Sequence, residues 1–379
     1  MEYNNILIIK MSSLGDVLHA LPFAAALRER YPEAKISWLV HPQFAGFVPE
    51  QPLIDEIIYF DKVEFNKMRW SERWQFVKKF RKELRSKNFD LVIDLQGLFK
   101  SAAVAFLTGT KEKIGYCEMR EGSRLISKPI CGEHCGDHVI ERYLDVARYL
   151  GARISGIEFP LPDLKQERLQ VHKLLESAGV NFVRRYKNLE GKFVAVNNES
   201  LSFPAFHPHN ALVPASYVVL VPGARWETKK WPPEYFAKLA GLFIADGLYV
   251  ILAGSKEDVR QGEIIKELAN FPKELIDFTG RTSLRELAAL IKESSFYVSG
   301  DTGPLHIATA LKKPLVAIYG PTRPERTGPY GNKDAMVLVA DVECVGCLKK
   351  QCSHWDCMHT VTPEMVYRAY KNKMEALHA

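Results

Sequence analysis

The fold of this chain is decided by the stretch Val298-Ser299-Gly300-Asp301-Thr302-Gly303-Pro304-Leu305-His306-Ile307-Ala308. The residues that lead into it, Phe296–Ser299, are typical of a β-strand. The residues from Pro304 to Leu311 can begin a helix, because a proline in the first helical turn loses no hydrogen bond. The stretch therefore predicts a strand, a tight turn and a helix that opens at the turn.

This turn has two interpretations. Thr302, Gly303 and His306 would lie at a helix start, where free N–H groups and the positive end of the helix dipole bind phosphate. Alternatively, Asp301 or Thr302 is an ordinary N-cap and His306 is a plain helix residue. The motif by itself leaves both interpretations open.

Two more turns of the same kind favour the phosphate site. The strand Tyr217–Val221 runs into a loop with the hydroxyl and two lysines of Thr228-Lys229-Lys230, ahead of a helix over Glu234–Ile244. A further strand, Leu248–Leu252, ends in a small turn that also opens a helix. Parallel strands place such turns along one edge of the sheet, where open α/β sheets bind ligands.

The amino-terminal half repeats this pattern. The apolar strand Ile6–Ile9 is followed by Ser12, Ser13 and Asp16 at a helix entrance. Asp16 fits a helix-start carboxylate as well as a catalytic group. Strands expected at Ile36–Val40, Glu56–Phe60, Leu91–Leu95 and Lys113–Gly115 alternate with helices near 19–31, 71–87, 97–107 and 139–150. The alternation predicts an α/β protein with doubly wound parallel sheets.

Five ordered motifs carry a resemblance to a known family. They are Ser12–Pro22, Asp94–Ser101, Lys229–Pro232, Asp301–His306 and Tyr319–Thr322. Together they resemble the ADP-heptose:lipopolysaccharide heptosyltransferases of glycosyltransferase family 9. The resemblance extends from residue 6 to about residue 331, with 181–216 outside it.

The resemblance implies a GT-B architecture, two Rossmann-like domains that face a cleft. Residues 1–160 would bind the acceptor and 161–362 the nucleotide-sugar. The second domain would include an irregular excursion at 181–216 and a Cys-rich tail at 344–357. A last helix within 363–379 is expected to pack on the first domain.

The resemblance also implies roles for individual residues. Asp16 would be the base of an inverting transfer. The donor ADP-heptose would be held by the remaining motif residues, namely Thr228, Lys229, Lys230, Glu257, Asp301, Thr302, Gly303 and His306. Within this set Lys229 would contact the phosphates, and Glu257 is the nearest match to an acidic ribose contact.

The acceptor is expected to be Kdo-lipid A or a related inner-core saccharide. Ser12, Ser13, Lys100 and Arg120 would contact it, the last two through the Kdo carboxylate. The amino-terminal motif is most similar to the heptosyltransferase I group. Two alternatives stay open, a nucleotide-sugar 2-epimerase on the same fold and a non-catalytic nucleotide-binding protein.

Composition limits the cellular setting. The chain is 47% hydrophobic, has a net charge of +6 and contains no apolar run near the roughly twenty residues of a membrane span. We do not expect the amino terminus to act as a signal peptide, because Lys10 interrupts the short apolar run and no small-residue cleavage site follows it. We expect a cytoplasmic protein, peripheral on the inner membrane, that binds no nucleic acid. The basic stretch from Lys62 to Arg85 fits either an anionic lipid surface or a solvated helix.

The Cys-rich tail contains Cys344, Cys347, Cys352 and Cys357. This spacing could hold structural zinc, although a plain structural role is favoured. Many glycosyltransferases hold a metal–diphosphate complex with a pair of acidic residues, and this chain contains no such motif. We therefore expect a transfer that requires no metal or other cofactor.

Overall fold

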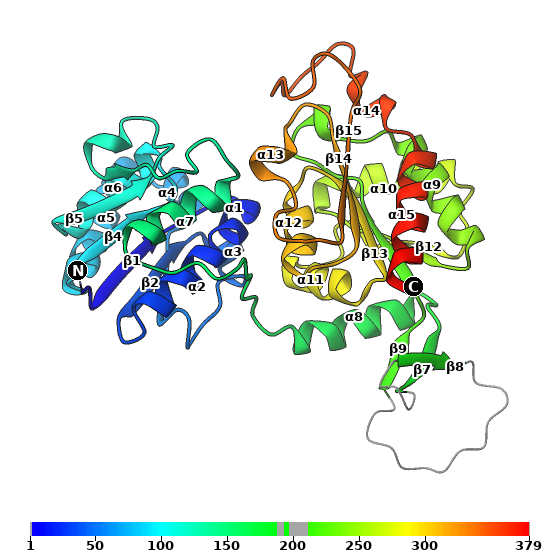
Figure 1. The fold of residues 1–379 in the computed structure, drawn as a ribbon, viewed down its shortest axis with the longest axis horizontal. Helices are drawn as coiled ribbons and strands as arrows, with labels where there is room; N and C mark the ends of the chain where they lie inside the picture. The colour runs from blue at the N-terminus through cyan, green and yellow to red at the C-terminus, as the bar shows by residue number, and fades with distance from the viewer. Residues whose placement is uncertain (1, 188–192, 197–210, 379) are drawn as a thin grey trace. The chain divides into compact units, whose positions relative to one another are not determined.

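The computed structural model describes residues 2–187, 193–196 and 211–378, and the chain divides into two compact units (Figure 1). The first unit contains 1–163, 309–311 and 324–332. The second unit contains 164–308, 312–323 and 333–379. The main division therefore lies close to the boundary expected at 160.

The first unit is built on a six-stranded sheet in the order β3-β2-β1-β4-β5-β6, and all of its pairs are parallel. Its strands are β1 (Asn5–Ile9), β2 (Lys35–Val40), β3 (Glu56–Tyr59), β4 (Leu91–Asp94), β5 (Glu112–Tyr116) and β6 (Lys128–Ile130). Its helices are α1 (Leu14–His19), α2 (Leu21–Arg30), α3 (Pro42–Ala45), α4 (Lys62–Lys67), α5 (Trp70–Ser86), α6 (Phe99–Thr108), η1 (Ser123–Leu125), α7 (Val139–Tyr149) and α13 (Pro324–Thr327).

The second unit repeats the arrangement with a parallel six-stranded sheet in the order β12-β11-β10-β13-β14-β15. Its strands are β10 (Tyr217–Val221), β11 (Tyr249–Leu252), β12 (Leu275–Asp277), β13 (Phe296–Gly300), β14 (Leu315–Tyr319) and β15 (Ala335–Val339). Its helices are α8 (Lys165–Ser177), η2 (Glu227–Lys229), α9 (Pro233–Ala245), η3 (Lys256–Asp258), α10 (Val259–Leu268), α11 (Leu284–Glu293), α12 (Gly303–Ala310), α14 (Cys357–Thr360) and α15 (Pro363–His378).

The two sheets confirm the predicted fold class. In the first sheet β1 lies between β2 and β4, and in the second sheet β10 lies between β11 and β13. The direction in which the chain adds strands to the sheet therefore reverses beside β1 and beside β10. The central strands β1, β10 and β13 are almost completely buried, which explains their continuous apolar sequence. Among the described residues, no helix is both long and apolar enough to cross a membrane.

Residues 181–216 depart from the expected irregular excursion. Three short strands, β7 (Phe182–Lys187), β8 (Phe193–Val196) and β9 (Ala211–Pro214), form an antiparallel sheet in the order β8-β7-β9. The irregular assignment is therefore wrong for these strands. Their β-branched and aromatic residues were a usable signal, but the prolines between them masked it. Residues 188–192 and 197–210 lie outside the described part of the chain.

The last helix packs on the core of the second unit, whereas its expected packing on the first domain stays a prediction. The ring of Tyr370 on α15 lies 4.9 Å from that of Phe243 on α9 and 5.0 Å from that of Phe296 on β13. Val366, one turn earlier, is fully buried in the same core. These two residues form an apolar face with helical spacing that is complementary to the second sheet.

A buried carboxylate organises the turn from β4 to α6. Asp94 is fully buried and accepts hydrogen bonds from the N–H groups of Gln96 (3.0 Å) and Gly97 (2.9 Å) and from the hydroxyl of Ser101 (2.9 Å). Burial raises the pKa of Asp94 to about 6, although these hydrogen bonds act in the opposite direction. The turn is therefore held by one carboxylate from strand to helix.

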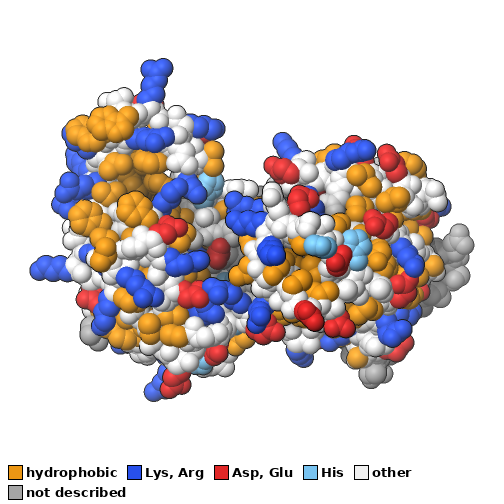
Figure 2. Space-filling model, turned by 90° about the horizontal axis from the view of Figure 1, so that it is seen from above, with side chains coloured by type: hydrophobic (Ala, Val, Ile, Leu, Met, Phe, Trp, Pro, Cys, Tyr) orange, Lys and Arg blue, Asp and Glu red, His pale blue; other side chains and the backbone are white. Residues whose placement is uncertain are grey.

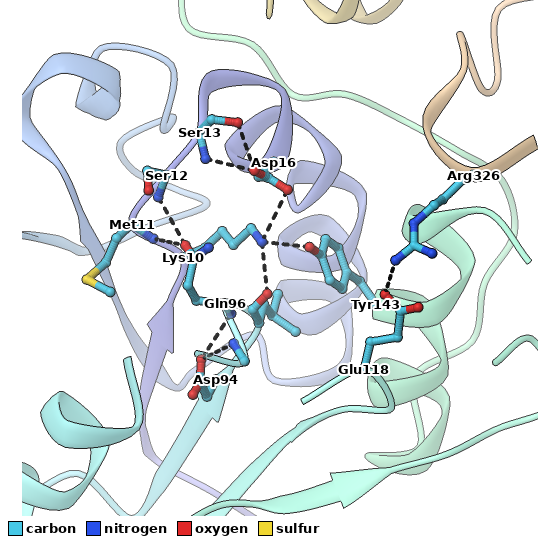
Figure 3. Close-up of polar contacts among 12 residues, drawn as sticks. Lys10, Met11, Ser12, Ser13, Asp16, Asp94, Gln96, Glu118, Tyr143 and Arg326 are labelled. Atoms are coloured by element: carbon cyan, nitrogen blue, oxygen red, sulfur yellow. Dashed lines mark hydrogen bonds and ion pairs between the residues drawn. The ribbon is translucent and has the colours of Figure 1, made fainter. Parts of the chain in front are cut away.

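The same turn holds the loop that follows β1. The side-chain oxygen of Gln96 accepts hydrogen bonds from the backbone N–H groups of Met11 and Ser12, both at 3.1 Å. Strands β1 and β4 are neighbours in the sheet, so their carboxyl ends meet at one edge. Gln96 thus fixes the loop after β1 against the loop after β4 (Figure 3).

Replacement of Tyr370 should destabilise the second unit. Tyr370→Ala removes a ring that contacts Phe243 and Phe296, and truncation of a buried aromatic side chain costs about 3 kcal/mol of unfolding free energy. Met365→Ala on the exposed side of the same helix is the matched control and should cost well under 1 kcal/mol. Denaturant unfolding of both variants measures the difference. Equal losses would contradict the packing described for α15.

Asp94→Asn should change how stability depends on pH. The pKa of Asp94 is raised from 3.8 to about 6, so the carboxyl group binds its proton more tightly in the folded chain. The contribution that this tighter proton binding makes to the unfolding free energy is fully present below about pH 4 and is lost as the pH rises through about 6. The unfolding free energy of Asp94→Asn relative to wild type should therefore rise by about 2 kcal/mol between pH 4 and 7. Denaturant unfolding across this range that gave a constant difference would contradict the raised pKa.

Candidate functional site

Asp16 lies at the start of α1, on the loop that follows β1 (Figure 3). One of its carboxylate oxygens, Oδ2, accepts hydrogen bonds from the backbone N–H and from the hydroxyl of Ser13, both at 2.8 Å. The side chain is 40% exposed, so a ligand can reach it. The carboxylate is therefore oriented from one side and open to solvent on another.

Lys10 lies beneath this carboxylate and is 2% exposed. Its ammonium donates to the hydroxyl of Tyr143 (2.7 Å) and to the carbonyl of Leu95 (2.9 Å), and it lies 3.6 Å from Oδ1 of Asp16. Burial raises the pKa of the Tyr143 phenol well above its usual range, so the hydroxyl stays neutral beside the ammonium. Asp16 thus has a fixed positive charge on its inner side.

Lys10 and Tyr143 belong to this site, although neither was predicted from the sequence. The signal for Lys10 was present, because a lysine that ends a strand buried on both faces needs polar partners. Tyr143 lies within α7, more than a hundred residues away in the chain, and no local pattern connects it with Asp16.

Two of the predicted acceptor residues line one pocket. Ser12 and Lys100 lie around it together with Lys62 and Gln96. Partial burial and the nearby ammonium of Lys62 lower the pKa of Lys100. Arg120 is exposed on the loop after β5, outside the lining of this pocket, and its N–H donates to the carbonyl of Gly97.

In the second unit, the two motifs with the strongest phosphate character meet. Lys229 forms an ion pair of 2.6 Å with Asp301, and their side chains are only 16% and 9% exposed. Gly300 permits this approach, because a Cβ at that position would lie 2.8 Å from the carbonyl oxygen of Lys229. The loop after β10 therefore crosses the carboxyl end of β13.

The neighbouring residues of this loop have other partners. Lys230 forms an ion pair with Glu227 at 2.6 Å. Thr228 is buried, and its hydroxyl donates to the carbonyl oxygen of Lys349 at 2.7 Å. Of the two lysines, Lys229 is therefore the one connected to the turn after β13.

The turn after β13 has the predicted form. Helix α12 begins at Gly303, directly after the strand, with Thr302 half-buried at its entrance. His306 lies in the first turn and is buried. The helix start and Lys229 occupy the same edge of the sheet, since β10 and β13 are parallel neighbours.

The turn after β11 shows a residue that the sequence analysis did not consider. Glu257 is exposed in η3, where a hydrogen bond with Ser255 lowers its pKa. Asp258 lies close to both glycine turns, because a Cβ added to Gly223 or Gly254 would collide with its side chain. Asp258 also accepts hydrogen bonds from the N–H and the hydroxyl of Ser255.

The four cysteines of the tail are free thiols, of which Cys344, Cys347 and Cys352 are exposed. Partial burial and the three neighbouring thiols raise the pKa of Cys357. In the described ranges, no group of three or more His, Cys, Asp or Glu side chains is arranged to hold a metal ion.

Two lipopolysaccharide heptosyltransferases are similar to this chain over most of its length. A lipopolysaccharide heptosyltransferase 1 of Pseudomonas aeruginosa is 29% identical over 92% of this chain and 87% of its own length. A lipopolysaccharide heptosyltransferase 2 of Escherichia coli is 28% identical over 88% of this chain and 87% of its own length.

Solved structures show the same fold. A family 9 glycosyltransferase from Veillonella parvula superposes with a TM-score of 0.75 at 21% identity, covering 99% of this chain and 98% of the other. An E. coli heptosyltransferase solved with ADP-2-deoxy-2-fluoro heptose gives a TM-score of 0.68 at 25% identity, covering 97% and 99%. These relatives do not favour the epimerase or the non-catalytic alternative. The family model "Glycosyltransferase family 9 (heptosyltransferase)" matches residues 77–357, and the chain therefore belongs to glycosyltransferase family 9.

Proposed function

We propose that this chain transfers a heptose from ADP-heptose to the Kdo-containing inner core of lipopolysaccharide. Family membership and the names of the relatives support this reaction. The observation that carries it is the exposed Asp16 carboxylate, held by Ser13 and backed by the buried ammonium of Lys10. This arrangement fits a base for an acceptor hydroxyl.

In this proposal the acceptor oxygen attacks the anomeric carbon of the heptose with inversion. The bond from that carbon to the diphosphate oxygen breaks, ADP leaves with the electron pair, and Asp16 takes the hydroxyl proton. Lys10 acts as a positioning residue, because its ammonium fixes the inner oxygen of the carboxylate while the other side stays open.

Positive charge for the departing ADP would come from the second unit. Lys229, the helix start at Gly303 and His306 lie along one edge of the sheet. Asp301 would hold Lys229 in place through their ion pair. These groups can stabilise a diphosphate without a metal ion or other cofactor.

We infer that the acceptor reaches the first unit from a membrane surface. Ser12 and Lys100 line the pocket near Asp16, and Arg120 follows on a neighbouring loop. Helix α5 carries much of the basic stretch and exposes Trp70 and Trp74, a combination suited to an anionic lipid interface. Figure 2 shows hydrophobic and basic side chains side by side on the surface of this unit. The enzyme would then work at the cytoplasmic face of the inner membrane.

The reaction can be tested directly with purified protein, ADP-heptose and Kdo-lipid A. Mass spectrometry should show an acceptor that is heavier by one heptose, with EDTA present or absent. Asp16→Asn should lower kcat by about 10²–10⁴, because the base is lost while one oxygen remains to accept from Ser13. Its ADP affinity, measured by calorimetry, should stay within a few-fold of wild type. An Asp16→Asn variant with nearly normal kcat would reject Asp16 as the base.

The two lysines of the loop after β10 should behave differently. Lys229→Ala removes the cation beside the helix start and leaves Asp301 unpaired, so donor KM should rise at least about tenfold and kcat should fall. Lys230→Ala is the matched control, since Lys230 pairs with the exposed Glu227, and its effect should stay within about threefold. Steady-state kinetics with varied donor checks both. The reverse pattern would move the phosphate contact to Lys230.

A further inference from the structure

The Cys-rich segment, residues 344–357, is joined to two loops that border the proposed donor site. The N–H groups of Gly346 and Leu348 donate to the carbonyls of Gly320 (2.9 Å) and Pro321 (2.8 Å), directly after β14. The carbonyl of Lys349 accepts from the hydroxyl of Thr228 at 2.7 Å. Three hydrogen bonds therefore fix the backbone of the segment from Gly346 to Lys349.

The next residue, Lys350, reaches the loop that carries Lys229. The ammonium of Lys350 lies 5.4 Å from the ring centre of Trp226, and the ammonium of Lys229 lies 4.5 Å from the same ring centre. A cation within about 6 Å of an aromatic ring is attracted to its face. The ring of Trp226 thus lies close to two ammonium groups from segments that are far apart in the chain.

The balance of charge at this place favours an anionic ligand. Lys229 is paired with Asp301 and Lys230 with Glu227, so both lysines of the loop have a carboxylate partner. Within the described part of the chain, Lys350 contacts Trp226 and forms no ion pair. A diphosphate carries at least two negative charges, and Lys350 is the ammonium whose charge is not already compensated.

We propose that Lys350 is a further donor-binding residue, whose ammonium contacts the diphosphate of the nucleotide-sugar, and that the Cys-rich segment serves to place it there. This inference rests on the proposed function. It gives the segment a part in donor binding, whereas the sequence analysis assigned it a purely structural role. Lys350 is exposed, so a diphosphate can reach its ammonium without displacing other groups.

A pair of neighbouring variants tests the proposal. Lys350→Gln keeps most of the side chain over Trp226 and removes only the charge. Lys349→Gln removes the same charge one residue earlier and keeps the carbonyl that Thr228 contacts. Lys350→Gln should weaken ADP binding and raise donor KM by about fivefold to tenfold. Lys349→Gln should stay within about twofold of wild type.

Adenosine has no phosphate, so its binding distinguishes the loss of a phosphate contact from a change in the shape of the binding site. Its affinity should be the same for wild type and both variants, measured by calorimetry on the full-length protein. Thermal unfolding of each variant checks that the fold is kept. Lys350→Arg retains the charge and should bind ADP within about twofold of wild type.

Several results would overturn the proposal. Wild-type ADP affinity in Lys350→Gln would do so, as would a loss of affinity in Lys349→Gln as large as that in Lys350→Gln. Equal losses for ADP and adenosine would also reject a phosphate contact. Wild-type protein that binds no ADP would overturn the proposed function together with this inference, whereas normal transfer by Lys350→Gln would overturn this inference alone.

Discussion

The buried ammonium of Lys10 is the interaction on which the first unit depends. A charge with 2% exposure is costly unless it is fully satisfied, and three oxygen atoms from different elements surround this one. They belong to Asp16 on α1, Leu95 after β4 and Tyr143 on α7. The ammonium therefore joins the end of the central strand to two helices, α1 and α7, and to the loop after the neighbouring strand β4, and it orients the proposed base.

The loop after β4 supports the same arrangement through hydrogen bonds. Asp94 orders its own turn, and Gln96 then holds the backbone of Met11 and Ser12. Asp16 is thus positioned from beneath by Lys10 and from the side by this loop. A base at a helix start that is held by its neighbours loses little freedom when a substrate binds.

In the second unit, an ion pair rather than a buried ammonium positions the proposed functional group. Its central strands β10 and β13 end side by side, and the glycine at position 300 lets one loop pass over the end of the other strand. The ion pair of Lys229 with Asp301 then fixes the lysine beside the start of α12. Because this pair compensates the charge of Lys229, further positive charge must come from the helix start and, in our proposal, from Lys350.

Much of this protein could be predicted from its sequence, and the limits of that prediction have physical causes. The alternation of strands and helices, the two Rossmann-like halves and the turns at Asp16, Lys229 and Gly303 are local patterns of hydrophobicity and turn chemistry, so they are readable along the chain. Other features depend on which surfaces meet in space. Helix α15 packs on the second unit because Val366 and Tyr370 fit its core, and β9 pairs with β7 although β8 lies between them in the chain. The partners of Lys10, the position of Asp258 against two glycines and the approach of Lys350 to Trp226 join residues far apart in sequence. Local patterns determine which elements form, whereas only tertiary packing decides which charged groups become neighbours, because that choice depends on the burial of whole faces.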